Sequence, residues 1–117
     1  MLITLTTKSE HLIICIKKDI LMENSREFSE ELEKTLQQAP DCQKISFDFE
    51  AVKFMDSSGI GFLIKASSKA KNENKDIIVY NLNKTLHSVF KLSGLHNMIS
   101  IYSRTELLAK FPELDNV

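Results

Sequence analysis

A short β-branched run, Ile77-Ile78-Val79, constrains the fold of this chain more than any other feature. Its consecutive apolar side chains predict a strand over 76–80 with both faces buried, as in parallel sheets covered by helices. The segment Ile45-Ser46-Phe47-Asp48-Phe49 alternates apolar and polar residues and predicts a second strand. Between the two runs, apolar side chains recur at helical spacing over 58–71. We therefore expect a β-α-β unit in the middle of the chain.

Further signals on both sides extend this unit to the order β-β-α-β-α-β-α-β-α. Two β-rich runs at 2–5 and 12–16 are close enough to form a hairpin, and an apolar residue at every fourth position predicts a helix over 25–38. A third helix, a last strand and a last helix are expected between Asn83 and Gly94, over 98–102, and between Ser103 and Pro112. Strands that alternate with helices through short connections predict an α/β fold with a mixed, mostly parallel sheet.

Some side chains are expected to fix the ends and loops of these elements. Asn24 is expected to cap the first helix, because its side chain can accept a hydrogen bond from a free N–H group. Val52, Phe54 and Met55 are expected to anchor the loop before the second helix inside the protein. Phe62 lies off the main apolar face of that helix, but core packing is expected of it, as of the other phenylalanines, in preference to a ligand-binding box.

Length and composition exclude several classes of protein. The chain of 117 residues fits a single domain, with a core over about 2–111 and a short polar C-terminal tail. A formal net charge of −1 provides no basic field, so neither nucleic acid nor a membrane is expected as a partner. Charged residues interrupt every apolar run near the N-terminus, which argues against a signal peptide or membrane span and for a cytoplasmic protein.

The sequence offers no catalytic or metal-binding constellation. His11, His87 and His96 show no metal-ligand spacing with cysteines or carboxylates, and the two cysteines form no Cys-x-x-Cys pair. Ser57 or Ser58 could act as a hydrolase nucleophile only with a neighbouring base, and the surrounding residues are not a Gly-x-Ser-x-Gly elbow. We therefore expect a non-enzymatic protein without a metal or cofactor.

The segment Phe54-Met55-Asp56-Ser57-Ser58-Gly59-Ile60-Gly61 lies where a strand gives way to a helix. Open α/β sheets carry their binding sites at the carboxyl ends of their strands, where such transitions lie. The two glycines remove side chains from the first helical turn, and free N–H groups at a helix start favour negative charge. From the residues alone the simpler interpretation is a helix cap, with Ser58 as the expected capping residue.

The same eight residues resemble the signature of bacterial anti-sigma factor antagonists, the STAS-domain family. Leu92-Ser93-Gly94-Leu95 resembles the late Ser-Gly-Leu turn of that family, and the order of strands and helices matches from about 2 to 111. The resemblance implies one STAS domain over 1–117. It also implies that Ser57, the first serine of the motif, is phosphorylated by a partner kinase that doubles as an anti-sigma factor. A metal-dependent serine phosphatase that acts on the phosphorylated form is the second implied partner.

The chain departs from the family pattern before its first helix. Where the family commonly has Gly-Glu-Leu-Asp, with an Asp that helps to meet the kinase, this chain has Ile20-Leu21-Met22-Glu23. Glu23 would keep an acidic contact, and exposed Leu21 or Met22 would add apolar contacts. The partner-binding surface implied by the resemblance consists of Glu23, Asp56, Ser58, Gly59, Ile60 and Gly61.

The function implied by the resemblance is that of a phosphorylation-switched binding module. When unphosphorylated at Ser57, it would bind an anti-sigma serine kinase and so release a sigma factor. The alternative is a STAS scaffold, or a small subunit of a lipid or anion transport complex, that does not use the serine. The complete Asp-Ser-Ser-Gly acceptor motif favours the switch, because a scaffold has no need to retain it.

Overall fold

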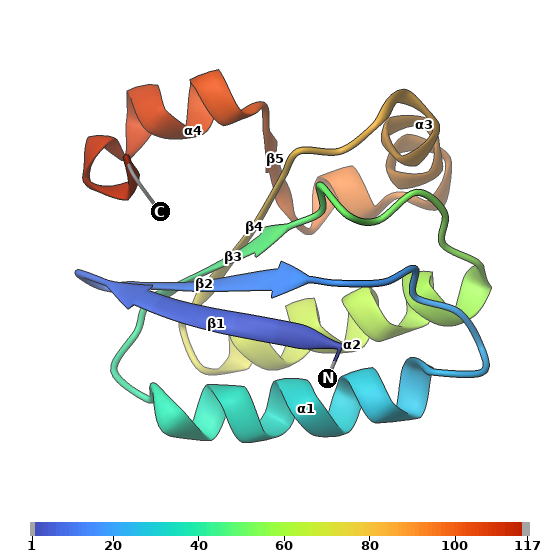
Figure 1. Cartoon of the computed structure of the whole chain (residues 1–117), viewed down its shortest axis with the longest axis horizontal. Helices are drawn as coiled ribbons and strands as arrows, with labels where there is room; N and C mark the ends of the chain where they lie inside the picture. Colours follow the sequence, from blue (N-terminus) through green and yellow to red (C-terminus); the bar gives the residue numbers. More distant parts are fainter. Residues whose placement is uncertain (1, 116–117) are drawn as a thin grey trace.

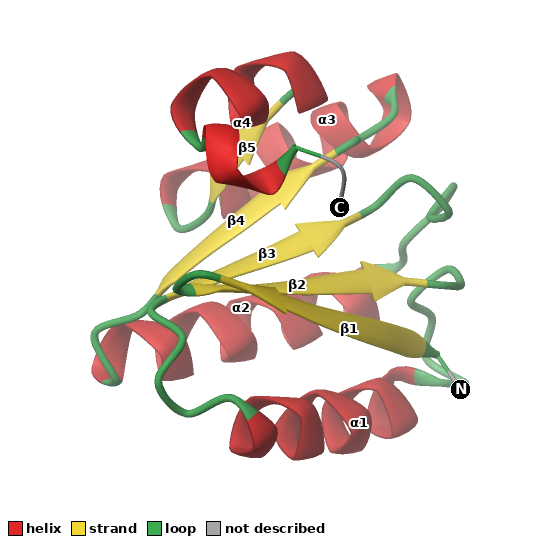
Figure 2. Ribbon diagram, turned by 60° about the vertical axis from the view of Figure 1, so that its left-hand side comes forward, coloured by secondary structure: helices red, strands yellow, loops and turns green. Residues whose placement is uncertain are grey.

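The five strands of the sheet lie side by side in the order in which they occur in the sequence (Figure 2). In the computed structural model, which describes residues 2–115, the first two strands form an antiparallel hairpin and the other three continue in parallel from the second. The strands are β1 (Ile3–Lys8), β2 (His11–Ile16), β3 (Lys44–Asp48), β4 (Asp76–Tyr80) and β5 (Ser100–Tyr102). The predicted mixed, mostly parallel sheet is confirmed.

The helices follow the predicted order and cover both faces of the sheet (Figure 1). The side chains of α1, α2, α3 and the short 3-10 turn η1 share one hydrophobic core with the sheet, whereas α4 and the 3-10 turn η2 pack on the opposite face. Their bounds are α1 (Ser25–Gln38), α2 (Ser57–Asn72), α3 (Lys84–Ser93), η1 (Leu95–Asn97), α4 (Arg104–Lys110) and η2 (Pro112–Leu114). Over residues 2–115, none of these helices is both long enough and apolar enough to cross a bilayer.

The two cores explain the apolar run in β4. Ile77 and Val79 belong to the larger core beneath α1, α2 and α3, and Ile78 and Tyr80 belong to the smaller core beneath α4. Successive side chains of a strand point to opposite faces, so a strand covered on both sides needs apolar residues at every position. The prediction that this strand is buried on both faces is confirmed.

The predicted caps are confirmed for two helices and wrong for α1. The Asn83 Oδ1 accepts a hydrogen bond from the Leu86 N–H at 2.8 Å, and Ser103 forms a reciprocal capping box with Glu106 at the start of α4. Asn24 precedes α1 as predicted, but its Oδ1 accepts from the Leu21 N–H at 2.9 Å instead of from the helix. Asn24 therefore stabilises the loop between β2 and α1 and does not cap the helix.

Of two aromatic residues near the start of α2, Phe54 differs from the prediction and Phe62 agrees with it. Val52 and Met55 are buried as predicted, but Phe54 is 52% exposed, so the prediction that it anchors the loop inside is wrong. Phe62 is buried, with its ring centroid 5.9 Å from that of Phe28 on α1. Because α2 packs against α1 as well as against the sheet, its buried surface is wider than the single apolar stripe that the sequence pattern shows.

Candidate functional site at the start of helix α2

Asp56 organises the start of α2. Its backbone is extended, and its Oδ1 accepts hydrogen bonds from the Ser58 N–H at 2.9 Å and the Gly59 N–H at 3.3 Å. Asp56 is therefore the capping residue, and the prediction that Ser58 caps the helix is wrong. A carboxylate at this position satisfies two of the four N–H groups that a helix start leaves unpaired, and its charge opposes the positive end of the helix dipole.

The second oxygen of Asp56 joins α2 to a neighbouring loop. Its Oδ2 accepts a hydrogen bond from the Met22 N–H at 3.0 Å, in the loop between β2 and α1. An isolated parallel bridge between Ile20 and Met55 holds the same two segments together. One carboxylate therefore caps the helix and also places the Leu21-Met22-Glu23 loop beside Ser57.

Asp19 forms a second link between these loops. Its Oδ1 accepts hydrogen bonds from the Lys53 N–H at 2.7 Å and the Phe54 N–H at 3.2 Å. The Asn83 side chain in turn donates to the Lys53 carbonyl oxygen at 3.2 Å. Asp19 was not among the predicted site residues, because an aspartate outside the motif and 34 positions from Lys53 gives no sequence signal for this contact.

Gly59 is required by the close approach of α2 to the backbone of the β2–α1 loop. A Cβ at this position would lie 2.8 Å from the Ile20 carbonyl oxygen and would also collide with the Met55 side chain. Gly59 is buried, so its role in the motif is to bring the helix start against Ile20. Gly61 is exposed, and a Cβ there would meet nothing within 4 Å, so packing does not require that glycine.

Ser57, the first residue of α2, is exposed. Among residues 2–115, neither its hydroxyl group nor its N–H group has a hydrogen-bond partner. The neighbouring Ser58 is half-buried, and its N–H is committed to Asp56. Of the two serines, Ser57 is the more exposed.

The other predicted surface residues lie around this serine in different environments. Glu23 is exposed and forms no ion pair within residues 2–115. Ile60 is partly buried against the core, and its N–H is bonded to the Asp56 carbonyl oxygen. The structure therefore brings the β2–α1 loop and the first turn of α2 together, as the resemblance implied for Glu23 and Asp56.

Two exposed apolar side chains flank the serine. Met22 is 78% exposed and Phe54 is 52% exposed, and the hydrogen bonds of Asp56 and Asp19 fix the backbone at each of them. Large apolar side chains held in the open on an ordered loop are typical of a protein-binding surface. The apolar contact expected of Met22 matches its exposure, whereas Leu21 is half-buried and Phe54 was predicted to be inside.

The site has no arrangement for metal-dependent or nucleophilic chemistry in the described part of the chain. Over residues 2–115, no three His, Cys, Asp or Glu side chains are grouped to hold a metal ion. No histidine forms a hydrogen bond with Ser57 or Ser58 in that range. What the geometry offers is a free hydroxyl group at a helix start, beside a carboxylate and two exposed apolar side chains.

Comparison with known proteins agrees with this architecture. A family model described as the STAS domain matches residues 3–107, and the chain therefore belongs to the STAS-domain family. An anti-sigma F factor antagonist from Paenibacillus polymyxa is 28% identical over 61 residues, which is 52% of each of the two chains. The chain thus aligns with about half the length of this curated relative.

Solved structures share the fold over nearly the whole chain. A putative anti-sigma factor antagonist from Thermotoga maritima superposes with a TM-score of 0.82 at 17% identity and covers 94% of both chains. The anti-sigma factor antagonist SpoIIAA in its unphosphorylated form gives a TM-score of 0.69 at 19% identity over 98% of this chain and 99% of that one. Phosphorylated SpoIIAA from Bacillus gives 0.66 at 21% identity, with 92% and 97% covered.

Proposed function

We propose that this protein is an anti-sigma factor antagonist that is switched by phosphorylation of Ser57. In the unphosphorylated state it binds an anti-sigma serine kinase and thereby releases a sigma factor, and a metal-dependent serine phosphatase restores that state. The protein itself is not an enzyme and acts in the cytoplasm. The observation that carries the proposal is the exposed Ser57 at the start of α2, whose hydroxyl group has no hydrogen-bond partner in the part of the chain that the structure describes.

The geometry around Ser57 suits an acceptor for a kinase. Within residues 2–115 the hydroxyl group has no hydrogen bond to break before it attacks a phosphate, and the residues before it form an ordered loop held by Asp19 and Asp56. Ser58 is a poorer acceptor, because it is half-buried one residue further into the helix. We therefore assign the modification to Ser57 and not to Ser58.

The surface that meets the kinase is proposed to surround this serine. It comprises Glu23, Asp56, Ser58, Ile60 and Gly61, with Gly59 contributing through the position of its backbone. Met22 and Phe54 extend the surface as apolar anchors, because Met and Phe are enriched at protein interfaces relative to the rest of the surface.

A phosphate on Ser57 would oppose binding at this surface. It adds a charge of about −1.5 to −2 beside the Asp56 carboxylate and in the neighbourhood of the Glu23 loop. Burying that charge against a partner without a matching cation costs several kcal/mol, and each 1.4 kcal/mol weakens binding about tenfold. The modified protein is expected to leave the kinase, which can then hold its sigma factor.

Calorimetric titration of the anti-sigma kinase from the same organism tests the proposal. Wild type and Ser57→Ala are expected to bind with similar affinity, whereas phosphorylated protein and Ser57→Asp are expected to bind at least tenfold more weakly. Ser58→Asp is the matched control for the added charge; because it lies further into the helix, it is expected to weaken binding less than Ser57→Asp.

Two outcomes would count against the switch. Equal affinities for wild type, Ser57→Ala and Ser57→Asp would favour a STAS scaffold, or a transport-complex subunit, that does not use the serine. Phosphopeptide mapping after incubation with kinase and ATP would contradict the assignment if the phosphate were found only on Ser58, or if Ser57→Ala were modified as fully as wild type.

A further inference from the structure

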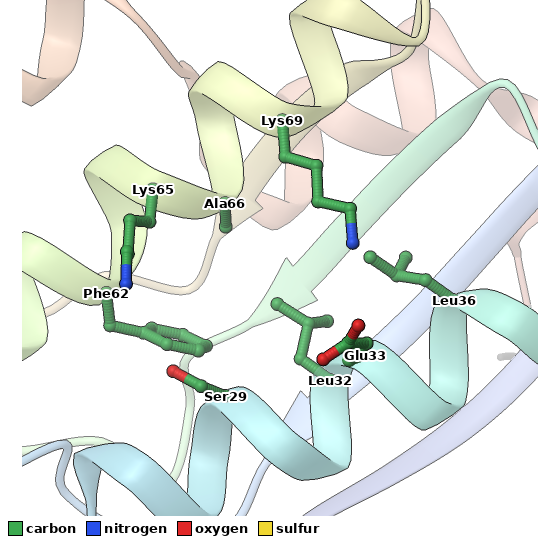
Figure 3. A pocket seen from close by; sticks show the side chains of 8 residues that line it. All are labelled: Ser29, Leu32, Glu33, Leu36, Phe62, Lys65, Ala66 and Lys69. Atoms are coloured by element: carbon green, nitrogen blue, oxygen red, sulfur yellow. The ribbon is translucent and has the colours of Figure 1, made fainter.

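A groove runs along the outer surface of the protein between α1 and α2 (Figure 3). Its cavity has a volume of about 310 Å³, within the range of pockets that bind small molecules. Apolar side chains form most of its lining, and polar groups from both helices surround them. The lining residues are Ser29, Leu32, Glu33, Leu36, Phe62, Lys65, Ala66 and Lys69.

The groove continues toward the C-terminal ends of both helices. A second cavity of about 450 Å³ shares Glu33, Leu36 and Lys69 with the first and extends to Pro40 and Glu73. The two cavities together form one elongated depression that follows the helices for more than two turns. Its shape suits a narrow, extended ligand better than a compact one.

Charged groups are distributed unevenly along the groove. The far end combines Glu33 and Glu73 with Lys69 and Lys75, which balance one another in charge. Lys65 lies at the other end, beside Phe62 and Ser29, without a carboxylate among the residues that line that end (Figure 3). Within residues 2–115, Lys65 forms neither an ion pair nor a hydrogen bond. Counted over both cavities, the lining carries three lysines and two glutamates, so the groove has a net charge of +1, with Lys65 at the end that has no carboxylate.

We propose that this groove binds a straight-chain alkyl carboxylate, with its carboxylate group at Lys65 and its alkyl chain lying along Leu32, Ala66 and Leu36. The Ser29 hydroxyl group, at the same end, can donate a hydrogen bond to the second carboxylate oxygen. A neutral alcohol or an alkyl cation would leave the Lys65 ammonium group unpaired.

This site is separate from the one proposed for phosphorylation. None of the residues that line the groove belongs to the motif around Ser57 or to the Leu21-Met22-Glu23 loop. Carboxylate binding therefore does not depend on the anti-sigma function, and either proposal can fail without the other. Ser57→Ala is expected to bind the carboxylate with the same affinity as wild type.

The proposal is tested by titrating the ¹⁵N-labelled 117-residue chain with decanoate below its micelle concentration. Binding is followed by the amide NMR shifts. The largest shifts are expected over 29–36 and 62–69. Lys65→Gln should weaken binding about two- to fivefold, the range expected for one exposed ion pair. Lys71→Gln is the matched control, because Lys71 lies on the same helix but does not line the groove. Decanol should bind more weakly than decanoate and with the same affinity to wild type and Lys65→Gln.

Several results would overturn the proposal. These are the absence of saturable shifts, shifts centred outside the groove, or an equal loss of affinity in Lys65→Gln and Lys71→Gln. Ala66→Leu, which fills the middle of the groove, provides a second test. Its amide spectrum reports whether the fold is intact, and a folded Ala66→Leu that binds decanoate as tightly as wild type would also contradict the site.

Discussion

At the scale of single residues, the two glycines of the motif have different roles although both lie in the first turns of α2. Gly59 packs against the Ile20 carbonyl oxygen, where a Cβ would be only 2.8 Å away, and Gly61 faces open space. A Cβ at Gly59 must displace backbone as well as the Met55 side chain, whereas a Cβ at Gly61 only adds helix propensity. The shared glycine spacing of the motif therefore combines a packing requirement with an accessible surface position.

We predict opposite effects for alanine at these two positions. Gly59→Ala should lower the free energy of unfolding by about 1–3 kcal/mol, the usual cost of an overpacked site. Gly61→Ala should raise it by about 0.5–1 kcal/mol, because alanine is the better helix former. Urea unfolding of the two variants beside wild type measures both changes. A Gly59→Ala protein as stable as wild type would show that α2 can shift away from Ile20 without cost.

Tyr80 gives a pH dependence that belongs to a single side chain. Burial beneath α4, together with the nearby Asp48 carboxylate, raises the pKa of Tyr80 to about 12 from 10.0. The unfolded chain loses this proton first as the pH rises, so the stabilising effect is complete below pH 10 and disappears between pH 10 and about 12. At about 1.4 kcal/mol per pKa unit, the loss is on the order of 2–3 kcal/mol.

Comparison with Tyr80→Phe isolates this effect from the other groups that titrate at high pH. The variant should show a shallower fall in the free energy of unfolding between pH 10 and 11.5 than wild type. Direct absorbance titration of the tyrosinate should find Tyr80 ionising only near pH 12. Parallel stability curves for the two proteins over that pH range would contradict the raised pKa.

At the scale of elements, Asp19 and Asp56 connect two loops that the sequence separates by a whole helix and strand. Each aspartate accepts backbone N–H groups across the gap, so the β2–α1 loop and the loop before α2 form one ordered edge. Met22 and Phe54 are exposed because these bonds fix their backbones while their side chains find no place in the core. The proposed partner surface thus depends on hydrogen bonds to the main chain and not on the core alone.

Asp19→Ala should loosen this edge locally. The Lys53 and Phe54 N–H groups would lose their acceptor, at a cost of about 1 kcal/mol for an exposed bond of this kind. Their amide hydrogens should then exchange several times faster with solvent. Asp41→Ala is a suitable control, since Asp41 is an exposed aspartate whose side chain forms no hydrogen bond within residues 2–115. Unchanged exchange at Lys53 and Phe54 in Asp19→Ala would refute the role assigned to Asp19.

The elements themselves were largely predictable from the sequence, because each carried a local signal. The apolar residues of β4 are consecutive in sequence. The Asn83 cap and the capping box at Ser103 are contacts between near neighbours in sequence. The errors concern residues whose environment the local sequence pattern does not show. Asn24 bonds the Leu21 N–H instead of the helix, Phe54 is held outward by Asp19, and Asp56 takes the capping position expected of Ser58. None of these three environments follows from periodicity or capping preference.

At the scale of the whole molecule, the sheet is covered on both faces, and a different set of helices covers each face. Three helices and η1 close the larger core on one face, while α4 and η2 close a smaller one on the other. The candidate partner surface lies at the C-terminal ends of β2 and β3, where the loops that follow these two strands meet. Ile20 and Met55 in these loops belong to the larger core. Ser57 itself is exposed, so a modification of its side chain need not disturb either core.

Phosphorylation of Ser57 is therefore expected to leave the fold intact. The phosphate would be added to an exposed residue, near an unpaired N–H group at the positive end of α2, which favours an anion by about 0.3–1 kcal/mol. Repulsion from the Asp56 carboxylate acts in the opposite direction, but Asp56 already accepts three N–H hydrogen bonds.

Urea unfolding of the phosphorylated and unmodified protein should give free energies that differ by less than about 1 kcal/mol, with the same dependence on denaturant. The Ser57→Ala protein, carried through the same kinase reaction, controls for the effect of that treatment itself. A loss of several kcal/mol, or a changed slope, would mean that the phosphate disrupts the cores and acts through an order–disorder transition. Nearly coincident curves, together with weakened kinase binding, would instead show that the phosphate acts at the partner surface and leaves the fold unchanged.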